Sequence, residues 1–295
     1  MHTVWDVRSA LASEPLLPVS AFTTLADGLD HPEGVACGPH GEIYAGGEAG
    51  QLYAVDSDGT VRQMAATGGF LLGLCLDADG NVYACDSGRH EVVRIALDGS
   101  VRTWSIGTPD RRMRTPNYPV FAPDGSLYVS DSGSWNADDG CLFRIGRDGA
   151  TSLVSDTLTA FPNGLAIDPN GRFLYVVLSQ LPGVVRLPLG GGEPERVVDL
   201  PGNVPDGLAF DDGGNLYIAC YTPSVIYRLH GSEPGGQLDV LVADWEATAI
   251  ATPTNIAFCG ADRRQLVVAS LSRWHLATTR MDVPGARLFY PSPMS

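Results

Sequence analysis

One short pattern recurs six times along this chain, and it constrains the fold more than any other feature. Its clearest copy is Val204–Cys220. In that copy a polar residue precedes a small one, a short apolar strand follows, and an Asp- and Gly-rich turn leads into a second apolar strand. The other copies follow this plan more loosely. Alternating apolar residues bounded by Gly and Asp are typical of a β-hairpin. The first position of the pattern, that of Asp206 in the clearest copy, is occupied in the six copies by Glu33, Leu72, Asn117, Asn163, Asp206 and Asn255.

The spacing of these copies predicts an all-β fold, a six-bladed β-propeller. Successive positions are 39, 45, 46, 43 and 49 residues apart, within the ~40–50 residues of a four-stranded blade. A sheet this small cannot bury both faces alone, and stacking such sheets around an axis leaves no open end. A pair of β-sandwiches is the alternative, but it would not need six similar units. The fifth copy shows four strands, at Gly207–Phe210, Leu216–Cys220, Val225–Leu229 and Leu238–Ala243.

The N-terminal region is expected to close the ring. Ala21–Leu29 resembles the fourth strand of a blade but precedes the first copy, whereas the last copy supplies three strands at most, through Trp274–Met281. We therefore expect the N-terminal strand to complete the last blade, which protects two strand edges. This reading divides the chain into a leader at 1–20 and a single propeller domain at 21–295.

Composition excludes several classes of function. The chain has 34 acidic and 19 basic residues, a net charge of −15, and every basic residue other than histidine is arginine. Nucleic acid and anionic membranes would be repelled, so the expected partner is a small-molecule substrate. The absence of lysine excludes Schiff-base and phosphate-loop lysine chemistry. The six cysteines show no C-x-x-C spacing, and with no signal h-region or apolar run long enough to span a membrane the sequence favours a cytoplasmic protein with reduced thiols.

The residues before each first strand carry the expected chemistry. The innermost strands of a propeller line its axis, so equivalent positions of the blades meet around the central channel. Five of these six positions hold oxygen-bearing side chains, and Leu72 is the exception. Two carboxylates and three amides suit a hard divalent cation, with calcium as the first choice, and no histidine or thiol argues for zinc. The alternative is local turn formation, which explains a single Asn-Gly or Asp-Gly but would not select Glu33.

The sequence resembles the SMP-30/gluconolactonase/luciferin-regenerating-enzyme-like family of six-bladed propellers over about residues 22–275. The matching motifs are Pro-Glu-Gly at 32–34, Pro-Asn-Gly at 162–164 and the stretch Pro205–Tyr221. The resemblance implies that Glu33, Asn163 and Asp206 hold one catalytic divalent metal ion, with zinc, manganese and magnesium as alternatives to calcium. It also implies that Asn117 contacts the substrate or the metal.

The sequence departs from the family where many lactonases carry an arginine two residues before that asparagine. Thr115 stands there, which argues against a simple aldonolactone as substrate, although Arg112 or Arg114 could replace the missing arginine. Arg114, Asn117, Tyr118 and Asn255 are therefore the candidate substrate-binding residues. The irregular segments 111–114 and 134–140 are candidates for the wall of the site.

Aromatic side chains near the inner strands have two readings, as walls of the site for an apolar or sugar-like ligand or as part of the core. They are Tyr118, Trp135, Tyr221 and Trp274. His31 lies two residues before Glu33 and is a candidate proton carrier, or else a structural loop residue.

The predicted function is metal-dependent hydrolysis of a lactone or related ester. The metal would polarise the carbonyl group, and Asp206 would be a ligand and also a catalytic base for the attacking water. The register of the repeats places Asp206 opposite Glu33 across the channel. One alternative is another reaction on the same site, such as phosphotriester hydrolysis or a biosynthetic lyase or cyclase step. The other is a non-enzymatic NHL-type binding module, which has no reason to gather carboxylates on its axis.

Overall fold

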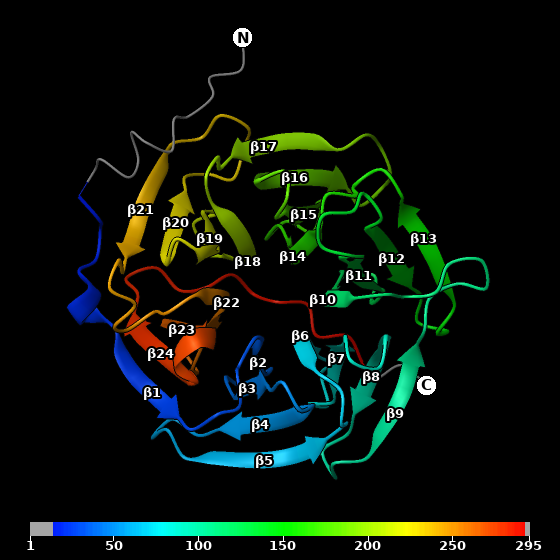
Figure 1. Cartoon of the computed structure of the whole chain (residues 1–295), viewed down its shortest axis with the longest axis horizontal. Helices are drawn as coiled ribbons and strands as arrows, with labels where there is room; N and C mark the ends of the chain where they lie inside the picture. Colours follow the sequence, from blue (N-terminus) through cyan, green and yellow to red (C-terminus); the bar gives the residue numbers. More distant parts are fainter. Residues whose placement is uncertain (1–13, 293–295) are drawn as a thin grey trace.

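The computed structural model describes residues 14–292, in which 24 strands form six four-stranded antiparallel sheets around a ring (Figure 1). Blade 1 contains β2 (Val35–Cys37), β3 (Ile43–Gly46), β4 (Gln51–Val55) and β5 (Val61–Ala66). Blade 2 contains β6 (Leu71–Leu76), β7 (Val82–Asp86), β8 (Glu91–Ile95) and β9 (Val101–Ser105). Blade 3 contains β10 (Pro116–Phe121), β11 (Leu127–Asp131), β12 (Cys141–Ile145) and β13 (Thr151–Ser155).

The other three blades repeat this plan, and the only helices in the part of the chain described are two short 3₁₀ turns. Blade 4 contains β14 (Pro162–Ile167), β15 (Phe173–Leu178), β16 (Gly183–Pro188) and β17 (Glu195–Asp199). Blade 5 contains β18 (Val204–Phe210), β19 (Leu216–Thr222), β20 (Val225–Leu229) and β21 (Leu238–Ala243). Blade 6 contains β22 (Pro253–Cys259), β23 (Gln265–Ser270), β24 (His275–Arg280) and β1 (Thr23–Asp27). The 3₁₀ turns are η1 (Val19–Ala21) and η2 (Leu271–Arg273).

The N-terminal strand closes the ring, as the sequence predicts. β1 pairs antiparallel with β24, with Thr23 opposite Thr278, so blade 6 is built from both ends of the chain. Residues 1–13 of the expected leader lie outside the described residues. Further on, the backbone N–H groups of Leu16 and Leu17 donate to carbonyl oxygens of β21, so this stretch lies against blade 5.

Each blade begins with a hairpin whose turn explains the repeated Asp and Gly. The carboxylates of Asp77, Asp168 and Asp211 each accept the backbone N–H of the residue four positions later, which fixes the chain reversal between the first two strands. Such side-chain bonding to nearby backbone is the reason that Asp favours turns. Short-range bonds in the turn therefore join the first two strands of these blades into a hairpin.

The core consists of six apolar clusters, one between each pair of neighbouring blades. Aromatic rings pack edge to face across these boundaries, with centroids 5.1 Å apart for Tyr83–Phe121 and 5.0 Å apart for Tyr175–Phe210. Such geometry is the preferred one for aromatic pairs. Burial therefore depends on neighbouring blades, which is why the sheets must stack in a ring.

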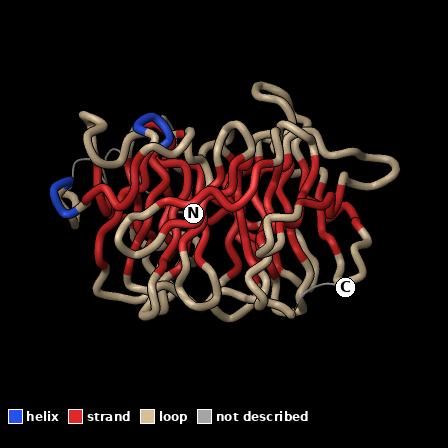
Figure 2. Tube along the Cα trace, turned by 90° about the horizontal axis from the view of Figure 1, so that it is seen from below, coloured by secondary structure: helices blue, strands red, loops and turns tan. Residues whose placement is uncertain are grey.

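Loops cover the two faces of this ring (Figure 2). We call the face at which the innermost strands begin the top face, and the opposite face the bottom face. Within each blade the strands alternate in direction, so the connections from second to third strand and from one blade to the next lie on the top face. The top face therefore carries the residues around Glu33, Asn117, Asn163 and Asp206.

Candidate active site

Bulges at the start of the innermost strands direct the site residues toward the axis. Pairing of β14 with β15 passes from Pro162 to Leu165, so Asn163 has no partner in the ladder. Pairing of β18 with β19 passes from Pro205 to Leu208, which leaves Asp206 unpaired in the same way. Asn117 is skipped in β10 by a similar irregularity. Bulges are common beside active sites because they re-aim a side chain without ending the strand.

Glycine after the site residue lets neighbouring blades approach closely. A Cβ atom on Gly164 would lie 2.1 Å from the carbonyl oxygen of Asp206, and one on Gly34 would lie 2.0 Å from that of Leu72. Real Cβ atoms do not come so near, so only glycine fits. This contact joins adjacent blades at the level of the site. The second half of the repeated Asn-Gly or Asp-Gly pair is thus a packing requirement between blades.

The carboxyl groups of Glu33 and Asp206 and the amide of Asn163 come together near the start of the innermost strands. Asp206 and Asn163 are buried, with exposures of 7% and 5%, and Glu33 is half-buried. Burial raises the pKa of Glu33 to about 7. Burial and then the charge of Glu33 raise the pKa of Asp206 well above its ordinary value, while the Asn163 side chain lowers it in part. Glu33 and Asp206 belong to blades 1 and 5, with only blade 6 between them. They are therefore not diametrically opposite, and the expectation from register alone was wrong on this point.

This donor set fits a divalent cation. The Asn163 amide nitrogen donates to Ser179 Oγ at 3.3 Å, which leaves its Oδ1 oxygen buried with no hydrogen-bond partner. An unpaired buried oxygen and two carboxyls that burial disfavours as anions would all be stabilised by one positive ion. Carboxylate and amide oxygens are also the ligands that calcium takes. The residues predicted as ligands therefore carry buried, unsatisfied oxygen chemistry that a cation would stabilise.

Side-chain hydroxyls hold the site residues in place. Ser132 Oγ accepts from the Asn117 amide nitrogen at 3.0 Å and donates to the Pro162 carbonyl of the next blade at 2.8 Å. Ser179 Oγ donates to the Pro205 carbonyl at 2.7 Å in the same manner. These serines were not predicted as site residues. A hydroxyl 15 or 16 residues after the asparagine, at the end of the second strand in both copies, is the signal that would have found them.

Two of the predicted substrate-binding residues contact each other across the ring. Tyr118 from blade 3 reaches Asn255 of blade 6, on the opposite side of the ring, by a long hydrogen bond of 3.5 Å from its hydroxyl to Oδ1. Both side chains are buried, at 9% and 3% exposure. Burial raises the pKa of Tyr118, so this phenol stays protonated. Tyr118 and Asn255 thus link blades 3 and 6 across the ring.

An apolar cavity of about 90 Å³ lies along the inner strands. Its lining includes Leu74, Ile167, Leu208 and Phe258, and residues 286–290 contribute the far end. That C-terminal segment crosses the ring (Figure 1). It is fixed by the Ala286 N–H, which donates to Phe210, and by the Tyr290 hydroxyl, which donates to Cys37 and Gly38. The channel is therefore closed by the chain itself on the bottom face.

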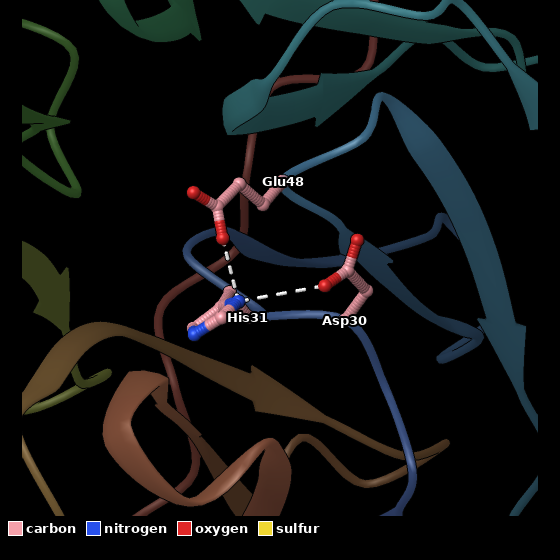
Figure 3. A group of neighbouring side chains, drawn as sticks. All are labelled: Asp30, His31 and Glu48. Carbon is pink, nitrogen blue, oxygen red and sulfur yellow. Dashed lines mark ion pairs between the residues drawn. The ribbon is translucent and has the colours of Figure 1, made fainter.

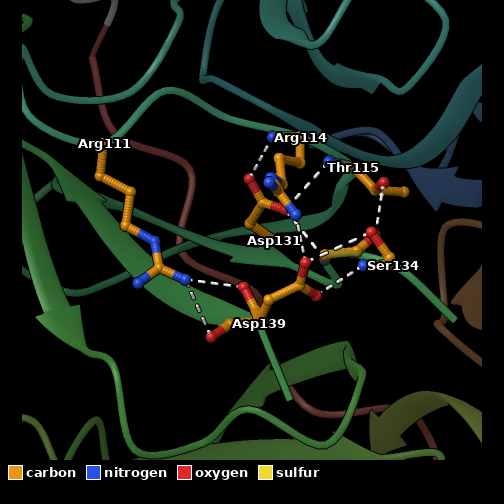
Figure 4. Close-up of polar contacts among 8 residues, drawn as sticks. Arg111, Arg114, Thr115, Asp131, Ser134 and Asp139 are labelled. Carbon is orange, nitrogen blue, oxygen red and sulfur yellow. Dashed lines mark hydrogen bonds and ion pairs between the residues drawn. The ribbon is translucent and has the colours of Figure 1, made fainter. Parts of the chain in front are cut away.

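Arg114 lies on the rim, away from the buried ligand set. Its side chain is exposed and pairs with Asp139, which also accepts the Ser134 N–H through Oδ1 at 2.7 Å (Figure 4). Arg111 donates to the carbonyl oxygens of Asp139 and Gly140, at 2.6 and 3.3 Å. These arginines join the segments 111–114 and 134–140 that the sequence marks as irregular. Their observed contacts are with protein groups.

A second acidic group lies beside the first blade. His31 Nδ1 is 2.6 Å from Glu48 Oε2 and 3.4 Å from Asp30 Oδ1 (Figure 3). Asp30 also accepts hydrogen bonds from Gln51 Nε2 at 3.0 Å and from the Ala49 N–H at 3.2 Å. The three ligand-type side chains lie close enough to hold a metal ion, but their partners within the protein explain the cluster as a support for the His31 loop.

Most of the cysteine thiols are buried in the blades. All six cysteines are free, and five of them are buried in the blades. Burial raises the pKa of Cys85 and Cys220 well above the ordinary value, which disfavours thiolate chemistry. Among residues 14–292 no helix is long and apolar enough to cross a membrane.

Comparison with solved structures identifies proteins of the same architecture. A putative gluconolactonase superposes with a TM-score of 0.75 at 23% identity, over 90% of this chain and 93% of the other. A gluconolactonase from Xanthomonas campestris gives a TM-score of 0.75 at 22% identity, over 90% and 89%. The calcium-binding protein regucalcin from Agrobacterium tumefaciens gives 0.77 at 16% identity, over 95% and 99%. At these identities the likeness establishes the fold.

Family models give a more specific result. Residues 20–55 match the N-terminal part of strictosidine synthase-like proteins. Comparison with curated protein sequences gave no match. Residues 104–272, more than half of the chain, match the SMP-30/gluconolactonase/LRE-like region. The chain therefore belongs to the SMP-30/gluconolactonase/LRE-like family of β-propellers.

Proposed function

We propose that this protein is a hydrolase that opens a lactone or related cyclic ester with the help of one divalent metal ion, calcium being the first choice. The observation that carries the proposal is the meeting of Glu33, Asp206 and the unpaired Asn163 oxygen at the top of an otherwise apolar channel. Membership of a lactonase-type family and the fold shared with gluconolactonases and regucalcin support it.

The three residues have separate tasks in this proposal. Glu33 and Asp206 supply the two negative charges that balance a divalent ion. Asn163, whose amide nitrogen donates to Ser179, supplies a neutral oxygen. When bound, the ion supplies Lewis-acid polarisation of the substrate carbonyl. Burial of the carboxyls strengthens any charge interaction in the site, because little water is present to screen it.

The hydrolytic step needs a proton acceptor, and Asp206 is the candidate. Water oxygen forms a bond to the carbonyl carbon while its proton passes to the Asp206 carboxylate. The ring C–O bond then breaks, and the leaving alkoxide oxygen takes that proton from the Asp206 carboxyl to give a hydroxy acid. Asn117, whose amide nitrogen is fixed by Ser132, presents its free Oδ1 for a substrate hydroxyl or for the metal. The base role of Asp206 competes with its role as ligand, because a carboxylate that binds a cation is a weaker base.

Substitution can separate these two roles. Asp206→Asn keeps an oxygen of similar shape but loses the charge and nearly all basicity. If Asp206 activates water, kcat at saturating metal should fall by ~10²–10⁴, the usual contribution of a positioned base. Glu33→Gln removes one charge without that base, so excess metal should restore most of its rate. Near-complete rescue of Asp206→Asn by metal would refute the base role and keep the ligand role.

Metal dependence itself is tested on a small lactone panel. The purified protein should bind about one equivalent of Ca²⁺ after loading and desalting, and a chelator should abolish hydrolysis. Mn²⁺, Mg²⁺ and Zn²⁺ added back in turn identify the preferred ion. Full activity in metal-free protein, or no hydrolysis of any lactone with any of these ions, would contradict the proposal.

A further inference from the structure

Two aromatic pairs stand on the top face at equivalent places of the ring. Trp135, on the connection from β11 to β12, packs edge to face on Phe161 with ring centroids 4.8 Å apart. Trp274, on the connection from β23 to β24, packs on the His31 ring at 4.4 Å and 59°. The two tryptophans remain 52% and 47% exposed. A large aromatic side chain left half open to water on two matching loops has surface available for a ligand.

Each pair is tied to a candidate metal ligand. Phe161 lies two residues before Asn163, and His31 lies two residues before Glu33. Both have left-handed backbone, with φ of 57° and 40°, so the two approaches to the inner strands share one unusual conformation. Asn163 belongs to blade 4 and Glu33 to blade 1, which are three positions apart in a ring of six. The two aromatic pairs therefore stand on opposite sides of the channel mouth.

Polar contacts hold both tryptophan loops in place. The loop of Trp135 is fastened by Thr115, whose hydroxyl donates to the Gly133 carbonyl at 2.7 Å, and by the Arg111 and Asp139 contacts of Figure 4. On the other side, Glu48 and Asp30 hold the imidazole against which Trp274 packs (Figure 3). A preformed wall costs less ordering on binding than a flexible one. The contacts of Arg111 with Asp139, and of Asp30 and Glu48 with His31, thus serve to position the two tryptophan loops.

Several donors near the mouth are already engaged within the protein. The hydroxyls of Ser132, Ser179 and Thr254 donate to backbone carbonyls of the following blades. The guanidinium groups of Arg111 and Arg114 are taken by the 134–140 loop. A substrate at this mouth therefore meets aromatic rings on two sides. Of the arginines in the 111–114 segment, only Arg112 has no side-chain hydrogen bond or ion pair within the described residues.

Resting on the proposed function, we infer that the substrate is a lactone or cyclic ester bearing an aromatic or other apolar ring substituent, clamped between the Trp135–Phe161 and His31–Trp274 pairs. The carbonyl lies at the Glu33, Asn163 and Asp206 level, and the substituent lies above it between the two walls. A simple sugar lactone would leave these walls empty.

Matched substrates test this inference. Hydrolysis of δ-valerolactone, phenyl-substituted δ-valerolactone and glucono-δ-lactone is measured as kcat/KM on the metal-loaded protein. Burying a phenyl group predicts a preference of ~10–100-fold for the phenyl lactone over δ-valerolactone. Trp135→Ala and Trp274→Ala should each lower kcat/KM for the phenyl lactone by ~3–10-fold and change that for δ-valerolactone little. Equal rates for the three lactones would overturn the inference while leaving the lactonase proposal intact.

Trp245 provides the control, because it is an exposed tryptophan of the top face with 65% exposure and no aromatic partner among the described residues. Trp245→Ala should leave the preference unchanged. Should no lactone be hydrolysed, calorimetric binding of phenyl-substituted δ-valerolactam against δ-valerolactam separates the two ideas. Phenyl-dependent binding that weakens in Trp135→Ala and Trp274→Ala, but not in Trp245→Ala, supports the clamp without the reaction. Binding that no tryptophan substitution changes refutes it.

Discussion

The carboxyl groups of the site make the stability of the metal-free protein depend on pH in a definite direction. Burial raises the pKa of Glu33 from its ordinary 4.5 to about 7. The unfolded chain therefore loses this proton at lower pH than the folded protein does. Between these two values the folded state binds more protons, so its stability falls as pH rises. Asp206, whose pKa is raised for the same reason, adds to the fall in the same direction.

The size of this effect follows from the two pKa values. Each tenfold change in a proton equilibrium is worth about 1.4 kcal/mol, so the Glu33 shift costs the folded metal-free protein on the order of 2–3 kcal/mol between pH 5 and pH 8. For a chain of this size that corresponds to a decrease in Tm of roughly 5 °C. Saturating Ca²⁺ stabilises the ionised carboxylates, so it should raise the Tm more at pH 8 than at pH 5.

Thermal unfolding with chelator and with Ca²⁺, at both pH values, measures the effect. Glu33→Gln removes the titrating group, so its Tm in chelator should depend less on pH than that of the wild type. The comparison of the two proteins cancels the contribution of histidines and other carboxyls. Identical pH dependence of wild type and Glu33→Gln in chelator would refute the assignment of this carboxyl to a buried cation site.

Two further predictions concern the frame of the site. Gly164→Ala places a Cβ where the Asp206 carbonyl stands, so it should destabilise the protein by ~1–3 kcal/mol and weaken Ca²⁺ binding measured by calorimetry. Gly190→Ala, with open space around it, is the matched control, and equal behaviour of the two variants would contradict the close-approach argument. Tyr290→Phe removes the hydroxyl that bonds Cys37 and Gly38 and should cost about 1 kcal/mol in denaturant unfolding. Arg287→Ala changes an exposed side chain of the same segment and should cost less than ~0.5 kcal/mol, whereas a larger loss than that of Tyr290→Phe would mean that the hydroxyl does not anchor the segment.

Much of the fold could be predicted from local patterns. The hairpin turns at Asp77, Asp168 and Asp211 depend on residues four positions apart, so their chemistry is visible in the sequence. Repetition of the unit then determines the architecture, because identical sheets with two apolar faces must stack on one another. The closing strand followed from counting strands at the two ends of the chain. Each of these features depends on short spacing or on repetition.

That the candidate ligands come together was predictable for a similar reason. Glu33, Asn163 and Asp206 occupy one position of the repeat, and a closed ring brings such positions around one axis. Their distances in sequence therefore do not matter. The register of the repeats, however, predicts that Glu33 and Asp206 stand opposite one another. The order of the blades shows that only blade 6 lies between them.

What only the tertiary structure decided are the contacts made across blades. The bulges that leave Asn163 and Asp206 unpaired in their ladders, the orphaned Asn163 oxygen and the Tyr118–Asn255 contact have no local signal in the sequence. The same holds for the pairing of Trp135 with Phe161 and of Trp274 with His31, and for the C-terminal segment across the bottom face. Periodicity fixes which faces of a strand are buried, whereas these side chains are positioned by chain segments that meet only when the ring closes.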